Sequence, residues 1–185
     1  SSGTMTITAT QDALDETDEY LFIDVTSVTN GTYFGQEEGM GSITITDDDN
    51  PPVVTLTRDN ATIAEAGGTS TVTATLDNVS GQDVTVNLNY SEGTATAGSD
   101  YSKSDSIIIT AGNLSGSMTI TATQDALDEA DEDLVVDVSS VTHGTYSSAM
   151  GSITITITDD DNPPVVTLTR DNATIAEAGG TSTVT

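Results

Sequence analysis

The chain has no cysteine and almost no basic residues. The absence of cysteine excludes disulfides, thiolate metal sites and cysteine nucleophiles, and it leaves the cellular compartment open. Only Arg58, Lys103 and Arg170 are basic, against 30 acidic residues, and the formal net charge is -27. Because so few cations cannot form a phosphate-binding surface, we expect neither nucleic acid nor an anionic membrane as a partner. No apolar run approaches the roughly 18 residues of a membrane helix, so direct membrane insertion is not expected either.

What the sequence does contain is a long internal repeat. Residues 43–73 recur without change at 155–185, and residues 6–16 recur at 119–129. The offsets are 112 and 113 positions, which is the size of a whole domain rather than of a solenoid unit. Such near-identity indicates recent duplication. We therefore expect these repeats to belong to a tandem array that is longer than this chain.

The chain is out of phase with its repeat. We interpret residues 1–49 as the C-terminal half of one repeat, 50–161 as a complete repeat, and 162–185 as the start of the next. The two incomplete parts would leave the edges of a β-sheet unpaired, which is unfavourable for exposed strands. We therefore expect head-to-tail contact with neighbouring repeats of the same chain, or with identical chains, to cover those edges.

Within the complete repeat, apolar residues alternate with threonine and other polar residues at a period of two. The pattern predicts seven strands, separated by turn residues, and no helix. These strands lie near 53–57, 72–76, 84–90, 107–109, 118–122, 134–138 and 153–157. The predicted fold is all-β, a seven-stranded antiparallel immunoglobulin-like β-sandwich, repeated head to tail.

Acidic residues cluster in the connections that such a sandwich would bring to one end. If consecutive strands alternate in direction, the first, third and fifth connections and the end of the last strand share one pole. The carboxylates at this acidic pole are Glu65, Glu92, Asp100, Asp125, Asp128, Glu129, Asp131, Glu132, Asp133, Asp159, Asp160 and Asp161.

Packed carboxylates need a counter-charge to stay ionised at neutral pH. Two unit charges about 4 Å apart repel by roughly 4 kcal/mol at an effective dielectric constant near 20. A cluster rich in hard oxygen ligands and free of histidine and cysteine matches Ca²⁺, which takes 6–8 oxygens, better than Mg²⁺, which keeps several waters. The alternative is a solvated acidic surface, as in proteins from high-salt environments.

Nothing in the sequence indicates an enzyme. The single histidine, His143, precedes Gly144 and is expected in a turn, and Asn30 takes its place in the first repeat. Paired carboxylates can serve a glycosidase, but here they recur in every repeat on the loops of a sandwich.

Four motifs together resemble the Calx-beta domain family, found in sodium–calcium exchangers, in integrin β4 and in large bacterial surface proteins. They are AEAGGT at 64–69, GTATAGSDY at 93–101, DALDEADEDL at 125–134 and ITITDDD at 155–161. The resemblance implies calcium ligands among residues Glu65, Asp100, Asp125, Glu129, Glu132, Asp159, Asp160 and Asp161, with Asp128 and Asp131 as further candidates. Gln124-Asp125-Ala126 departs from the run of aspartates in the exchangers, which leaves the number of ions open. The incomplete repeats keep part of the same set, namely Asp12, Asp15, Glu16, Asp18, Glu19, Asp47, Asp48, Asp49 and Glu177.

These observations favour a calcium-binding structural repeat of an extracellular or cell-surface adhesin, filament or surface layer. The Asn162-Pro163-Pro164 junction follows the triple aspartate, and prolines stiffen a linker, so bound Ca²⁺ would fix the angle between neighbours. Two alternatives are a calcium-sensing regulatory domain and repeats that bind glycans or cells directly. Near-identical copies favour the spacer, and Thr-rich strand faces without an aromatic patch weigh against direct adhesion.

Overall fold

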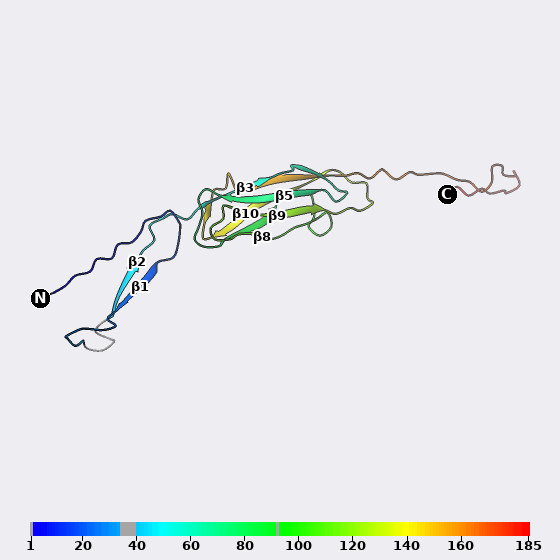
Figure 1. Ribbon diagram of the computed structural model, residues 1–185. Coiled ribbons are helices and arrows are strands. Elements are labelled where there is room, and N and C mark those ends of the chain that lie inside the picture. The colour runs from blue at the N-terminus through cyan, green and yellow to red at the C-terminus, as the bar shows by residue number, and fades with distance from the viewer. Residues whose placement is uncertain (1, 34–39, 92) are drawn as a thin grey trace.

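The computed structural model describes residues 2–33, 40–91 and 93–185. These residues form twelve strands and no helix, and therefore no helix long and apolar enough to cross a membrane. A central sandwich lies between two extended segments, and the N- and C-termini lie at opposite ends of the molecule (Figure 1).

The central sandwich lies within residues 50–161, the range predicted to be a complete repeat, and contains ten of the twelve described strands. In chain order they are β3 (Val53–Arg58), β4 (Thr62–Ala64), β5 (Thr69–Leu76), β6 (Val84–Ser91), β7 (Tyr101–Ser102), β8 (Ser106–Ile109), β9 (Ser115–Ala122), β10 (Glu132–Thr142), β11 (Thr145–Tyr146) and β12 (Ser152–Thr158).

The strands form two five-stranded sheets. One has the order β4-β12-β10-β6-β8, and the other has the order β11-β3-β5-β9-β7. The predicted immunoglobulin-like sandwich is confirmed, and each of the seven predicted strands corresponds to one of the longer strands. The count of seven was too low, because β4, β7 and β11 add two or three residues each. The pairing is also not wholly antiparallel, since β4 runs parallel to β12 and β11 runs parallel to β3.

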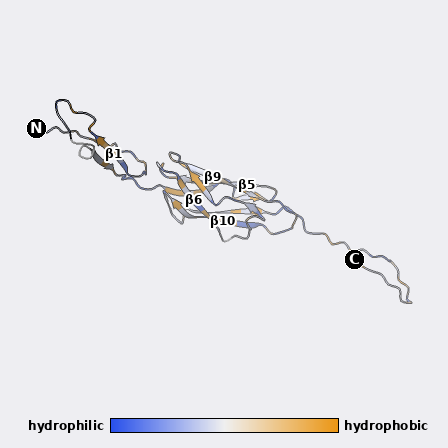
Figure 2. Cartoon of the chain, turned by 90° about the horizontal axis from the view of Figure 1, so that it is seen from below, coloured by the Kyte–Doolittle hydropathy of each residue, from blue (hydrophilic) through white to orange (hydrophobic). Residues whose placement is uncertain are grey.

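The alternating sequence places one face of each sheet in a shared core. On β5, Val72, Ala74 and Leu76 are buried while the threonines between them are half-buried or exposed. Ile120 on β9 and Ile155 on β12 are fully enclosed in the same core. Hydrophobic residues are accordingly concentrated on the strands of the central sandwich (Figure 2). Burial of these side chains, at about 25 cal/mol per Å² of apolar surface, is the main force that holds the two sheets together.

The chain passes from one sheet to the other between β3 and β4. β3 ends at Arg58, and the side chain of Asp59 accepts the N–H groups of Asn60 and Thr71, each at 2.7 Å. These bonds lower the pKa of Asp59 and fix the bend. The chain then joins the other sheet, where the N–H of Glu65 donates to the carbonyl of Thr158 at 3.0 Å.

The turn after Glu65 requires both of its glycines. Gly67 has a φ of +76°, a conformation that costs glycine little. A Cβ on Gly68 would lie 2.5 Å from the carbonyl oxygen of Ala64. The pair lets the chain reverse tightly, so that Glu65 is held at the end of the sandwich.

The partial repeats keep local features of the complete one. β1 (Glu19–Asp24) pairs with β2 (Met40–Ile45), and Glu19 opposes Ile45 just as Glu132 opposes Ile157. In the C-terminal segment a single bridge joins Arg170 to Val184. Arg170 and Val184 correspond to Arg58 and Val72, which pair in the same way in the central sandwich, so the partial repeats keep the pairing register.

Candidate metal centre

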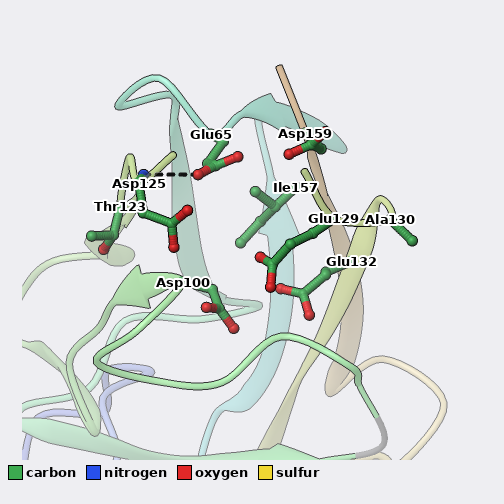
Figure 3. Close-up of a pocket in the computed structure, with 9 residues that line it drawn as sticks. All are labelled: Glu65, Asp100, Thr123, Asp125, Glu129, Ala130, Glu132, Ile157 and Asp159. Atoms are coloured by element: carbon green, nitrogen blue, oxygen red, sulfur yellow. Dashed lines mark hydrogen bonds between the residues drawn. The ribbon is translucent and has the colours of Figure 1, made fainter. Parts of the chain in front are cut away.

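Four chain segments bring carboxylates to one pole of the sandwich. Glu65 follows β4, Asp100 precedes β7, residues 123–131 connect β9 to β10, and residues 159–161 follow β12. The turn before β5, the end of β9 and the end of β12 meet there because β4 pairs with β12 and β5 pairs with β9. Side chains from all four segments line one cavity, drawn in Figure 3.

The carboxylates form two groups. The first, called the Glu65 group, contains Glu65, Asp159 and Asp161, and the second, called the Asp100 group, contains Asp100, Glu129 and Glu132. Within each group one carboxylate oxygen per residue lies within 4.8 Å of the others. The side chains of the Asp100 group gather at one side of the cavity, with Glu65 and Asp159 at the other (Figure 3).

Glu65 is the best-fixed member of the site. It is only 7% exposed, and its Oε1 accepts the N–H of Asp125 at 2.9 Å. Asp125 in turn accepts the N–H of Leu127 with Oδ1 at 2.8 Å, which turns the loop back on itself. Asp125 therefore lines the cavity between the two groups and belongs to the site.

Two buried carboxylate oxygens in the Glu65 group have no hydrogen-bond donor. They are Oδ1 of Asp159 and Oδ2 of Asp161. A buried acceptor left without a partner costs about 1–3 kcal/mol, and more when it is charged. A cation bound beside these two oxygens would offset that cost.

The electrostatics of the site disfavour the ionised state. Desolvation and the neighbouring carboxylates of Asp125 and Asp100 raise the pKa of Glu129. Desolvation and Asp100 likewise raise the pKa of Glu132, and desolvation together with Asp160 raises that of Asp161. The ion pair found among the described residues joins Lys103 to Asp105 and involves no member of either group.

The donor set fits calcium. Both groups and Asp125 offer carboxylate oxygens alone, without nitrogen or sulfur, and hard cations prefer such ligands. A cavity lined by carboxylates from four separate segments suits the 6–8 oxygen shell of Ca²⁺ better than the strict octahedron of Mg²⁺.

Other predicted residues at this pole lie outside the two groups. Asp160 is exposed and accepts a hydrogen bond from Nε2 of Gln124 at 3.1 Å. Asp131 accepts the N–H of Asp159 at 3.2 Å, so it positions a member of the Glu65 group. Asp128 is exposed and belongs to neither group, and Glu92 lies outside the described residues.

The N-terminal partial repeat keeps the contacts between the loop before its last two strands and the triple aspartate. Gln11 donates to Asp48 at 3.0 Å and the N–H of Asp47 donates to Asp18 at 3.1 Å, which repeats the Gln124 and Asp131 contacts. The residues that line its cavity include Asp12, Glu16, Glu19, Asp47, Asp48 and Asp49. Desolvation and neighbouring acids raise the pKa values of Glu16 and Asp49. Glu177, the counterpart of Glu65 in the C-terminal segment, is exposed.

Sequence reasoning did not identify what holds Asp100 in place. Its carboxylate accepts the N–H of Thr96, and its own N–H donates to the carbonyl of Thr96 at 2.9 Å. The sequence signal for this turn was Gly98, two residues before Asp100. In the structure Gly98 has a φ of +90° and closes the turn.

The fold and the site together define a class, a β-sandwich with carboxylates gathered at one pole. The sequence model of the Calx-beta domain matches residues 47–161, which is more than half of the chain. The chain therefore belongs to the Calx-beta domain family.

Among solved structures, the Calx CBD1 domain supports the sandwich fold. The apo-form Calx CBD1 domain matches with a TM-score of 0.52 and 21% identity, over 60% of this chain and 100% of that domain. The calcium-binding domain CBD12 of CALX1.1 matches with a TM-score of 0.49 and 20% identity, over 60% of this chain and 44% of that one. A two-domain protein of unknown function from Bacteroides fragilis has a TM-score of 0.46 and 10% identity, over 66% of this chain and 52% of that one. No curated protein sequence matches the chain.

Proposed function

We propose that the complete repeat binds Ca²⁺ at its acidic pole. The observation that carries the proposal is the pair of carboxylate groups, with two buried oxygens that lack any donor. Glu65, Asp159 and Asp161 would ligate one ion, and Asp100, Glu129 and Glu132 would ligate another, with Asp125 between them. Membership of the Calx-beta family supports the choice of metal.

We further propose that the calcium-loaded repeats form a stiff, non-enzymatic spacer in an extracellular adhesin, filament or surface layer. The termini of the chain lie at opposite ends (Figure 1), so successive repeats continue along one direction. Asp161 directly precedes Asn162 and two prolines, and Asp159 lies two positions before Asp161. An ion held by these aspartates would fix the exit of the linker, and the prolines limit its bending.

Thermal unfolding of the full chain tests the calcium site. Unfolding is measured in EDTA, in millimolar CaCl₂ and in matched MgCl₂. Extracellular calcium modules bind at roughly 0.1–1 mM, so about 10 mM calcium is roughly a 10- to 100-fold excess over Kd, and one site then stabilises by about 1.4–2.7 kcal/mol. The expected result is a rise in Tm of about 10 °C with calcium and a much smaller rise with magnesium. An unchanged Tm in calcium would reduce the acidic pole to a solvated surface.

A further inference from the structure

Two copies of one loop sequence occupy different environments in this chain. The six residues QDALDE stand at 11–16 and again at 124–129. Asp15 in the first copy is only 8% exposed, whereas Asp128 in the second is exposed. Leu14 is half-buried, but Leu127 is 60% exposed. Because the sequences are identical, the difference arises from what lies against the loop.

The first copy contacts the connection between β5 and β6 of the following repeat. The carbonyl oxygen of Asp15 accepts the N–H of Gly81 at 3.1 Å and the hydroxyl of Ser80 at 3.4 Å. Asp15 and Ser80 thereby form a parallel bridge between residues 65 positions apart.

The receiving loop is held in place by its own domain. Ser80 is 1% exposed, its carbonyl accepts the N–H of Gly112 at 2.9 Å, and its hydroxyl accepts the N–H of Gln82 at 3.0 Å. The side chain of Asp83 accepts the N–H of Ala111 at 2.8 Å. The two donors aimed at Asp15 are therefore presented by a loop that is tied to the turn between β8 and β9.

The shape of this surface depends on Gly81. A Cβ at this position would lie 2.7 Å from Cγ and 2.8 Å from Oε1 of Glu16. The three nearest atoms all belong to Glu16, so a side chain at 81 would meet the preceding repeat before any part of its own domain. Glycine leaves room for the loop to approach.

We propose that Ser80 and Gly81 form a docking surface for the QDALDE loop of the preceding repeat. By the same geometry, Leu127 and Asp128 are the matching element for a following copy of this repeat, and that copy would cover the exposed Leu127. The docking surface and its loop lie at opposite poles of one domain, so the contact repeats head to tail. This inference rests on the array in the proposed function, but it does not require that calcium binds.

Distance measurement across the junction tests the proposal in the full chain. Because the chain lacks cysteine, spin labels can be placed at Ser42→Cys on β2 and Thr119→Cys on β9, both exposed positions. Pulsed electron paramagnetic resonance then reports the distribution of distances between the two repeats. The test variant is Gly81→Leu, and the control is Asn78→Leu, an exposed residue in the same connection.

The expected result is a single narrow distribution in the parent and in Asn78→Leu. In Gly81→Leu the distribution should broaden about twofold, since the docked state is lost and the junction samples many angles. A Gly81→Leu distribution that matches the parent overturns the proposal.

A thermal melt in calcium and in EDTA separates this inference from the calcium site. An unchanged calcium-dependent rise in Gly81→Leu shows that the sandwich is folded and that broadening reflects lost docking. Broadening without a calcium response in any variant supports docking and rejects calcium binding. A calcium-dependent rise in Tm without broadening in Gly81→Leu supports calcium binding and rejects docking.

Discussion

Glu65 and Asp125 lie 60 positions apart and are joined by a hydrogen bond of 2.9 Å from the N–H of Asp125 to Oε1 of Glu65. The bond connects the turn before β5 to the loop after β9, the two segments that close one side of the acidic pole. A buried carboxylate held by a backbone donor is oriented before any ion arrives. Such preorganisation lowers the entropy lost on binding.

Glu65→Gln should weaken calcium binding at the Glu65 group by about tenfold or more, or about 1.4 kcal/mol, because it removes a charge while keeping the hydrogen-bond acceptor. Isothermal titration calorimetry measures the effect. Glu177→Gln is the matched control, since Glu177 has the same sequence context but is exposed. Equal affinities in both variants would remove Glu65 from the ligand set.

The two carboxylate groups predict at least two ions per complete repeat. Asp100→Asn should weaken one binding event by about tenfold and leave the other nearly unchanged, because Asp100 belongs to one group only. Native mass spectrometry counts the ions and calorimetry separates the events. Asp128→Asn, which alters an exposed residue outside both groups, should change neither. If Asp100→Asn abolished both events, the two groups would be a single site.

Stability without calcium should fall as the pH rises from 4.5, the ordinary pKa of a glutamate, through the raised pKa values of Glu129 and Glu132. The folded-state pKa values of Glu129 and Glu132 are raised above the ordinary 4.5, so the folded chain binds more protons than the unfolded chain. Their stabilising contribution is complete below about pH 4.5 and is lost as the pH passes through the raised values. Asp59, whose pKa is lowered from 3.8, acts in the opposite direction only at more acidic pH.

Thermal unfolding in EDTA at several pH values checks this dependence. Glu129→Gln with Glu132→Gln should flatten the pH profile, and saturating calcium should reverse it. A melting temperature in EDTA that is constant over this range would contradict the expectation.

Ile155→Ala should destabilise the sandwich by about 2–5 kcal/mol, since Ile155 is fully buried and the substitution leaves a cavity. Ile43 holds the same sequence position in the first repeat but is 39% exposed. Ile43→Ala should therefore change stability by only about 0.5 kcal/mol. Urea unfolding of the two variants measures the difference, and similar losses would mean that the first repeat is packed as tightly as the second.

Most of the seven predicted strands carry a period-two pattern, as in Val72, Ala74 and Leu76, and β8 was predicted from the short apolar run at 107–109. The short strands β4, β7 and β11 were not predictable, since two or three residues carry no detectable period. The change of sheet after Arg58 depends on the pairing of Thr62 with Thr156, which no local pattern encodes.

For the site, topology alone placed the four acidic segments at one pole. Their division into two groups was not predictable, because it depends on the loop fold set by the Asp125 to Leu127 hydrogen bond. The contact of Asp15 with Ser80 and Gly81 was not predictable either, because the sequence around Ser80 and Gly81 is typical of an ordinary turn.

The strands at the two ends of the sandwich determine how it bears a pulling force. β3 begins at one pole and is flanked by β11 and β5, and β12 ends at the other pole between β4 and β10. Tension along an array therefore acts along the axes of these strands, while their hydrogen bonds lie across that direction. Extraction of either strand has to shear a whole ladder of bonds together rather than open them one by one, so each domain resists stretching as a unit.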